Sequence, residues 1–440
     1  MKVIYGIKEG LLAVSRELFF SDQASNKNIE DSILKIFGSR LTPDQVVNEI
    51  LSEVSKTGDD ALRKYTKMID GVDLKDIALD YKSIADSVDG LNPAVLDALR
   101  ISAERVRQFH MNTVPKSWFD ESKGYGEVMR PVEKVGVYIP GGRASYPSTV
   151  LMTAIPARVA GVKEVFLATP SSGQNGVNIN VLAAASVAGV DRVFNVGGAQ
   201  AIAAFAFGTD TIPKVDMICG PGNLFVTIAK RMVYGQVGID GLAGPTETLI
   251  VADDSANPIL CAADLLGQAE HDLLATPILI TTSEALVDKV MLEVDKQLVN
   301  LSKKEIASVS MENRGVIVVV DNIDDALNIA NAYAPEHLCL MIEEPWQVID
   351  KVSNAGGVFL GESSPEVMGD YIAGPSHVMP TGGTARFNSS LGVAQFIRRT
   401  PVISLNQDTI NDLAETAVTL AQVEGFDAHA QAVNFRISPG

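Results

Sequence analysis

The sequence predicts an α/β protein built from two parallel-sheet domains. Between residues 133 and 360, nine short apolar runs alternate with helical stretches, and strands separated by helices form parallel sheets. The chain has 440 residues and is 46% hydrophobic, enough for more than one core. For this length, two smaller sheets facing each other across a cleft fit better than one open sheet of nine strands.

The first third of the chain is predicted to be mostly helical. Thr42-Pro43-Asp44-Gln45 supplies an N-cap, a proline at the first helical position and a capping-box glutamine. Asn92-Pro93 repeats the cap and the proline, so a second long helix should run towards His110. His110 has no suggestive polar neighbours and is expected to be a structural or surface histidine.

The strands and the C-terminal helix come next along the chain. The apolar runs predict strands at 135–139, 164–168, 192–196, 216–219, 248–252, 277–281, 315–320, 337–342 and 357–360. A helix is expected over 408–423, followed by a short tail. This last segment is too small for its own core, so it should pack on another domain or subunit.

The composition limits the classes of binding partner that are expected and indicates the cellular compartment. A formal charge of −18 argues against nucleic acid as a partner. No apolar run approaches the roughly 20 residues that span a bilayer, so no membrane association is expected, and charges interrupt the apolar N-terminus where a signal peptide would lie. Cys219, Cys261 and Cys339 lie in apolar stretches and are expected to be buried free thiols of a cytoplasmic protein.

Two short segments carry candidate metal ligands and acid–base groups. Gln268 and His271 are three residues apart at the end of a predicted helix, so both can reach one cation; ordinary hydrogen bonds are the alternative. Glu336-His337 lies between a helix and a strand and suits acid–base work, although a solvated turn has the same pattern.

A glycine-rich loop after the last predicted strand carries Asp370 and His377. Loops beyond strand ends commonly bind ligands in α/β proteins, and a carboxylate close to a histidine favours a functional loop over a simple turn.

No G-x-G-x-x-G fingerprint of a conventional dinucleotide fold follows a predicted strand. Pro140-Gly141-Gly142, Gly197-Gly198-Ala199-Gln200 and Gly220-Pro221-Gly222-Asn223 each do follow one, and their backbone N–H groups could meet a pyrophosphate. Taken singly, each is explained equally well as a structural turn.

Eight segments in this order resemble the histidinol dehydrogenase family, over roughly residues 40 to 436. They are VGVYIPGGRASYPSTVLM, GGAQAIAAFAFGT, PKVDMICGPGNLFVTIAKR, LAGPTETLIVAD, DLLGQAEHD, APEHL, GDYIAGPSHVMPTGG and EGFDAHAQAV. The resemblance implies two Rossmann-like domains of incomplete, unconventional form, with small helical appendages at the N- and C-termini. It also implies a four-electron oxidation of L-histidinol, via histidinaldehyde, to L-histidine with two NAD, the last steps of histidine biosynthesis.

The resemblance also implies roles for individual residues. One Zn²⁺ per subunit would be bound by Gln268, His271, Asp370 and His429, with Glu336 and His337 catalytic. The substrate would contact Thr246, Gln268, His271, His337, Asp370, His377, Glu424 and His429. NAD would contact Tyr138, Gln200 and Asn223. The family commonly has serine where this chain has Thr246, and the extra methyl crowds the pocket.

The resemblance further implies a domain division and a homodimer. Residues 1–26 would form an N-terminal arm, 27–136 with 242–390 the domain carrying the metal and catalytic loops, and 137–241 the NAD-binding domain. Residues 391–440 would form an arm that crosses to the partner, so that His429 enters the partner's site.

Several alternatives remain open from the sequence. A related zinc- and NAD-dependent dehydrogenase would act on another small hydroxylated substrate. A zinc hydrolase would use Glu336 to activate water without a dinucleotide, and a nonenzymatic binding protein is the least favoured reading. The ligand set also suits manganese or cobalt.

Overall fold

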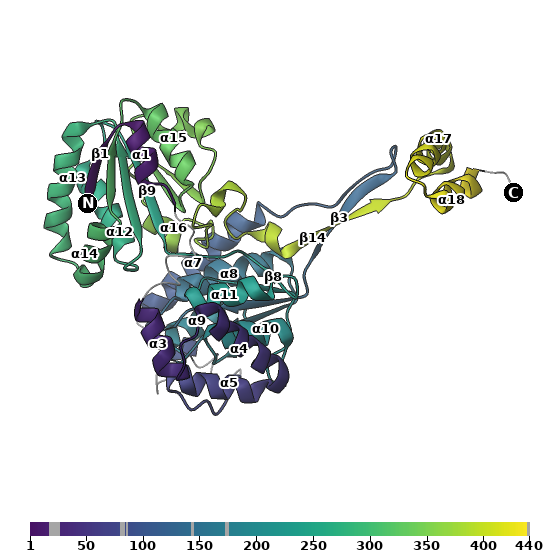
Figure 1. The fold of residues 1–440 in the computed structure, drawn as a ribbon, viewed down its shortest axis with the longest axis horizontal. Helices are drawn as coiled ribbons and strands as arrows, with labels where there is room; N and C mark the ends of the chain where they lie inside the picture. The colour runs from purple at the N-terminus through teal and green to yellow at the C-terminus, as the bar shows by residue number, and fades with distance from the viewer. Residues whose placement is uncertain (17–26, 80–83, 85–86, 142–144, 172–175, 438–440) are drawn as a thin grey trace.

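Two parallel sheets with helices on both faces form the body of the molecule (Figure 1). The computed structural model describes residues 1–440 except 17–26, 80–83, 85–86, 142–144, 172–175 and 438–440. All nine strands predicted from the sequence are present, and the predicted α/β class with two parallel sheets is confirmed.

The larger sheet has six parallel strands in the order β1-β11-β10-β9-β12-β13. They are β1 (Lys2–Tyr5), β9 (Glu247–Ala252), β10 (Thr276–Thr281), β11 (Val316–Val319), β12 (His337–Met341) and β13 (Gly357–Leu360). One face packs on α12 (Pro258–Ala269), α13 (Glu284–Leu298) and α14 (Lys304–Asn313). The other packs on α1 (Ile7–Ala13) and α15 (Ile323–Tyr333), and the short α16 (Glu366–Tyr371) follows β13.

The smaller sheet has five parallel strands in the order β6-β5-β4-β7-β8. They are β4 (Lys134–Tyr138), β5 (Glu164–Ala168), β6 (Arg192–Phe194), β7 (Met217–Cys219) and β8 (Gly238–Ile239). One face is covered by α4 (Pro43–Thr57), α5 (Asp59–Tyr65), α10 (Gly198–Phe207) and α11 (Leu224–Val233), with α3 (Lys27–Phe37) and the π-helix Thr66–Asp70 beside them. The other face is covered by α7 (Pro93–Met111), α8 (Pro147–Ala160) and α9 (Ile179–Ala188).

The expected domain division differs from this arrangement in three places. Residues 2–5 are not part of an arm, because β1 pairs with β11 at the edge of the six-stranded sheet. The helices between 27 and 111 pack on the five-stranded sheet, not on the one that carries Glu336. Residues 391–396 belong to the body, since Leu391, Val393 and Phe396 are buried in the core of the smaller sheet. Periodicity reveals which helix face is apolar but not which sheet covers it.

The chain connects the two sheets so that opposite edges meet. Residues 240–246 alone separate the end of β8 from the start of β9, so the carboxyl edge of the smaller sheet faces the amino edge of the larger one. The loop after α16 spans the same boundary, where the Ser376 hydroxyl donates to the carbonyl oxygen of Met152 in α8 at 2.9 Å. Residues from both halves therefore converge here.

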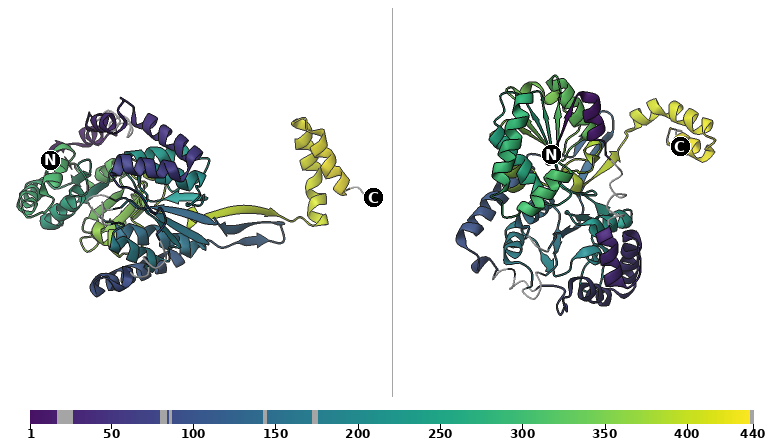
Figure 2. Two further views of the ribbon diagram at one scale, coloured as in Figure 1. Left: turned by 90° about the horizontal axis from the view of Figure 1, so that it is seen from below. Right: turned by 60° about the vertical axis from the view of Figure 1, so that its left-hand side comes forward.

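A long extension projects from the body (Figures 1 and 2). Its stem is an antiparallel sheet of β2 (Trp118–Asp120), β3 (Tyr125–Pro131) and β14 (Ile397–Ile403), and its end is the helical pair α17 (Gln407–Val423) and α18 (Asp427–Ile437). Only Ala414 and Ala430 are buried in these two helices, while Leu420 and Phe435 are 58% and 77% exposed. This extension leaves much apolar surface uncovered within one chain.

The predicted helix starts are confirmed by their caps. The Thr42 hydroxyl accepts from the Gln45 backbone N–H, the Gln45 side chain accepts in return, and Asn92 caps α7. His110 is 1% exposed in the core, and its burial lowers its pKa to about 4, in keeping with a structural histidine. The three cysteines are buried free thiols, as expected. Among the described residues, no helix has the length and apolar character needed to span a bilayer.

Candidate active site

Glu336 and His337 stand at the amino edge of the six-stranded sheet, where β12 begins beside β9. Helix α15 ends at Tyr333, and Ala334 has φ 54°, the only positive φ of a non-glycine residue in the described part of the chain. Such a conformation costs a non-glycine residue about 1 kcal/mol or more. The turn delivers His337 opposite Thr248 of β9, and Glu336 and His337 are 7% and 4% exposed.

The hydrogen bond of His337 determines its tautomer. Its Nδ1 lies 3.1 Å from the backbone oxygen of Glu247, and a carbonyl oxygen can only accept, so Nδ1 carries the proton. Nε2 is buried and has no partner among the residues that the structure describes. The unshared electron pair of Nε2 is therefore available as a base.

The Glu336 carboxylate is held by two donors from the segment that enters β9. The Thr246 hydroxyl donates to Oε2 at 2.6 Å and the Glu247 backbone N–H donates to the same oxygen at 3.0 Å. Burial raises the pKa of Glu336 to about 8, and the hydrogen bond from Thr246 opposes that shift. A carboxyl group that titrates near neutrality suits general acid–base catalysis.

The Gln268 amide lies behind this pair at the end of α12, 2% exposed. The network assigns its orientation. Its oxygen lies 3.0 Å from the Glu247 backbone nitrogen and shares that N–H with Glu336 Oε2. Its nitrogen donates to Thr248 Oγ1 and Glu366 Oε1, both at 3.0 Å. Glu366 is 2% exposed, and burial raises its pKa to about 8. The sequence did not single out Glu366, because nothing in its neighbourhood marks it as buried.

His271, Asp370 and His377 gather on the side of this cluster that faces α8. The charge of Asp370 partly offsets the lowering of the His271 pKa by burial. The Asp370 backbone oxygen lies 2.8 Å from His377 Nδ1, and His377 Nε2 lies 3.0 Å from Thr149 Oγ1. His377 thus links the loop of the larger half to the first turn of α8 in the smaller half.

Glu424 and His429 lie apart from these residues. Glu424 ends α17 and His429 is in α18, where its ring packs on Phe426 with the ring centroids 5.0 Å apart. Both are exposed on the extension, which projects away from the body (Figure 1). Within the described part of one chain, no group of three or more His, Cys, Asp or Glu side chains is placed to hold a metal.

The residues expected to contact a dinucleotide lie at the carboxyl edge of the smaller sheet. β4 and β7 are neighbours whose following helices cover opposite faces, and ligands bind at such switch points. The Tyr138 hydroxyl accepts from the Gly198 backbone N–H at 3.1 Å, whereas Asn223 caps α11 by accepting from Val226 at 3.2 Å. Gln200 is fully buried, and neither polar atom of its amide has a described partner.

The glycines of these turns allow close approach of chain segments. A Cβ at Gly220, where φ is 109°, would lie 2.1 Å from the Tyr138 backbone oxygen, and one at Gly197 would lie 2.6 Å from Pro170 Cβ. Gly142 lies outside the described residues, so its expected role is not addressed by the structure.

The chain is similar to known proteins over nearly its whole length. It matches the histidinol dehydrogenase family over residues 39–437. The histidinol dehydrogenase of Dehalococcoides mccartyi (strain CBDB1) is 44% identical, covering 99% of this chain and 100% of that protein, and the one from Deinococcus radiodurans is 46% identical at the same coverage. The chain belongs to the histidinol dehydrogenase family. The crystal structure of the family member from Elizabethkingia anophelis has a TM-score of 0.91 at 34% identity, covering 99% of this chain and 98% of that one.

Membership of the histidinol dehydrogenase family bears on the alternatives left open by the sequence. It identifies an oxidoreductase of histidine biosynthesis and disfavours a hydrolase, a binding protein or a dehydrogenase of another substrate. Within this family member, one chain brings together Thr246, Gln268, His271, Glu336, His337, Asp370 and His377, and leaves Glu424 and His429 apart.

Proposed function

We propose that this chain oxidises L-histidinol to L-histidine in two steps at one site, with zinc and NAD. The observation that carries the proposal is the buried pair at the start of β12: a carboxyl group with a pKa near 8 beside an imidazole whose Nε2 has no described partner. The two oxidations release protons from the alcohol and from the attacking water, and this pair offers a base for each.

The donor set of the body fits a zinc ion. Gln268, His271 and Asp370 offer oxygen and nitrogen ligands, which zinc accepts. Burial lowers the pKa of His271, which favours the neutral imidazole that binds metal. When bound, zinc would hold the amino and imidazole nitrogens of the substrate and act as a Lewis acid. His429 would complete the four ligands.

The carboxyl edge of the smaller sheet fits NAD. The buried amide of Gln200, unpaired among the described residues, needs a hydrogen-bonding partner that a bound dinucleotide can offer. Tyr138 is the last residue of β4 at the same edge, and Asn223 is the N-cap of α11. When bound, NAD would supply the hydride acceptor for both oxidations.

In the first oxidation, Nε2 of His337 accepts the proton of the substrate hydroxyl. The bond from Nδ1 to the Glu247 backbone oxygen fixes the ring and stabilises the imidazolium that forms. In the second oxidation, ionised Glu336 accepts one proton from the water that attacks the aldehyde, and the His337 imidazolium returns its proton to the aldehyde oxygen, which gives a gem-diol. His337 accepts that proton again as the second hydride leaves. The buried setting of both residues limits escape of the aldehyde.

We also propose a homodimer in which the extension from 397 to 437 crosses to the partner. The exposed apolar side chains of α17 and α18 need cover that one chain does not provide, and His429 would then complete the partner's zinc site. The three buried thiols favour the cytoplasm, where cysteines stay reduced.

The test is the amount of NADH formed per molecule of L-histidinol consumed by the purified, zinc-loaded protein. A ratio of about two, the count of hydrides in a double oxidation, with loss of activity after treatment with a chelator, supports the proposal. Absence of NADH formation with histidinol contradicts it.

Replacing Thr246 with valine should shift the pH dependence of the second oxidation. Glu336 acts as a base only when ionised, so the rate falls as the pH drops through its pKa of about 8. The hydroxyl of Thr246 stabilises the ionised form. Its loss should raise the pKa and move the fall in rate to higher pH by about one unit.

The measurement is kcat/KM against pH with histidinaldehyde as the substrate. Thr246→Ser keeps the hydroxyl and is the matched control, so its profile should remain that of the wild type. An unshifted profile in Thr246→Val would remove Thr246 from the control of Glu336.

A further inference from the structure

Glu247 connects the two catalytic side chains through its backbone. Its N–H donates to Glu336 Oε2 at 3.0 Å, and its carbonyl oxygen lies 3.1 Å from His337 Nδ1. The positions of the Glu336 carboxylate and the His337 imidazole therefore depend on the position of Glu247, the first residue of β9. A shift of this backbone would move the base of each oxidation at once, and misplacement by about 1 Å can cost 10²-fold in rate.

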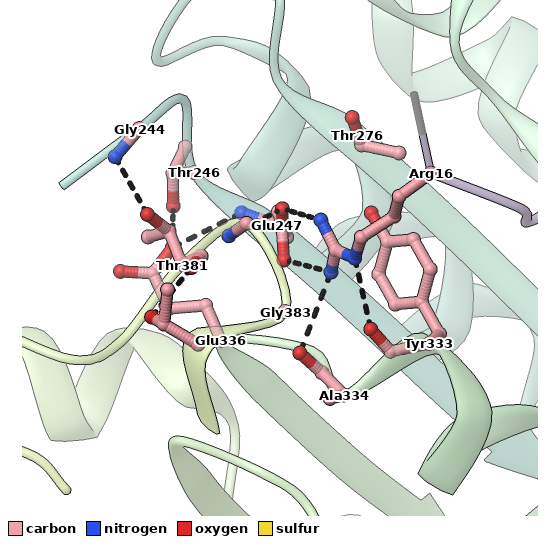
Figure 3. A network of polar contacts seen from close by, with 12 residues as sticks. Arg16, Gly244, Thr246, Glu247, Thr276, Tyr333, Ala334, Glu336, Thr381 and Gly383 are labelled. Carbon is pink, nitrogen blue, oxygen red and sulfur yellow. Dashed lines mark hydrogen bonds and ion pairs between the residues drawn. The ribbon is translucent and has the colours of Figure 1, made fainter. Parts of the chain in front are cut away.

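The side chain of Glu247 is buried and paired with Arg16 (Figure 3). Glu247 is 5% exposed. Its carboxylate accepts hydrogen bonds from both terminal nitrogens of the Arg16 guanidinium, one of them at 2.6 Å, and from the Gly382 backbone N–H at 3.1 Å. A bidentate guanidinium fixes a carboxylate in distance and in plane, which an ammonium group does not.

Arg16 also holds the segment that leads into Glu336. Its Nε donates to the Tyr333 backbone oxygen at 2.9 Å, and a terminal nitrogen donates to that of Ala334 at 3.4 Å. The guanidinium lies 3.7 Å from the centroid of the Tyr333 ring. These contacts clamp the turn in which Ala334 adopts its positive φ, two residues before Glu336.

A glycine next to Arg16 leaves room for its side chain. Gly383 has φ 78°, and a Cβ there would lie 3.2 Å from Arg16 Cδ. The charge of Glu247, which Arg16 pairs with, also raises the pKa of Glu336, behind the larger effect of burial. Arg16 precedes the part of the chain, 39–437, that matches the family, and it follows α1 in the short N-terminal segment.

We propose that Arg16 is a positioning residue of this active site: it fixes Glu247, whose backbone orients Glu336 and His337, and it clamps the turn that delivers them. Arg16 does not touch the reacting atoms. The N-terminal segment is thus part of the catalytic apparatus, although it lies far from the catalytic residues in sequence. The effect on turnover rests on the proposed function, whereas the effect on His337 does not.

The first experiment compares Arg16→Met with the wild type and with Arg158→Met. Arg158 forms an ion pair with Asp191 and bonds to three backbone oxygens, far from the site, so its variant reports the cost of losing an ordinary arginine. Arg16→Met should lower kcat for histidinol about 10²-fold and leave KM for NAD within about twofold, and Arg158→Met should change neither. Arg16→Lys, the more conservative change, should fall between them and serves if Arg16→Met does not fold.

A second substitution tests whether Arg16 acts through Glu247. In Arg16→Met the carboxylate of Glu247 is left buried without its partner, a costly state. Adding Glu247→Gln removes that charge, so the double variant should regain at least tenfold of the lost kcat. If the loss of kcat in the double variant equals the product of the losses in the two single variants, the two residues act independently and the proposal is overturned.

The second experiment observes the imidazoles without turnover. The chain has five histidines, so nitrogen resonances of protein labelled with ¹⁵N-histidine can be assigned by replacing them one at a time. Arg16→Met should shift the His337 nitrogens and disturb its Nδ1–H tautomer, and Arg158→Met should leave them unchanged. An unmoved His337 in Arg16→Met overturns the proposal even if activity falls. If the wild type does not oxidise histidinol but His337 shifts, the proposed function fails and the positioning role stands.

Discussion

Glu336→Gln is expected to slow the second oxidation about 10³-fold while it changes the first by less than about tenfold, because only the second step needs the carboxylate as a base for water. The amide retains the shape of the side chain and can still accept from Thr246 and from the Glu247 backbone. The base of the first step, Nε2 of His337, is left in place. The variant should therefore produce about one NADH per histidinol and release or retain the aldehyde.

Rapid-mixing measurement of NADH separates the two oxidations, and histidinaldehyde supplied directly tests the second alone. Glu344→Gln, an exposed glutamate beyond the far end of β12, is the matched control and should behave as the wild type. Equal losses in both oxidations would contradict the separate roles of Glu336 and His337.

Mixing two inactive variants is expected to restore activity if the extension crosses between subunits. His429→Asn lacks the proposed ligand on the extension, and His337→Asn lacks the base in the body. In a mixed dimer with crossed extensions, one site combines an intact body with an intact His429. Random exchange of subunits then gives about a quarter of the wild-type activity per site, from two preparations that are each nearly inactive.

The result depends on subunit exchange, so the mixture is denatured and refolded together, and each variant alone is treated in the same way. A refolded mixture of wild type with His337→Asn confirms that refolding succeeds. If that mixture is active but the two variants together are not, each His429 serves its own chain or none.

The strands of both sheets could be predicted from sequence because parallel strands buried on both faces are continuous apolar runs. β10 and β12 show this, with nearly every residue buried. The stem of the extension was not predicted. β3 and β14 contain Pro131, Pro401 and several charged residues and face water on both sides, so neither alternation nor an apolar run marks them.

The site could be predicted where a residue type is rare, and not where position alone gives it meaning. Five histidines in 440 residues made His337 and His377 conspicuous, and the structure gathers them near Gln268 and Asp370. Arg16 and Glu366 are ordinary charged residues in sequence. Only the fold places Arg16 against Glu247 and buries Glu366 beside Gln268, because both contacts span more than 80 residues of chain.

The pairing of β1 with β11 has a consequence for how the protein is made. Lys2 leaves the ribosome well before its partner Val316, which follows roughly 15 to 60 s later at 5–20 residues per second. The helices and strands of the smaller sheet, which lie between them in sequence, can assemble during that interval. Strand β1 therefore stays unpaired while the smaller sheet forms, and the nascent active site acquires the contacts of Arg16 only after the segment around Tyr333 has emerged.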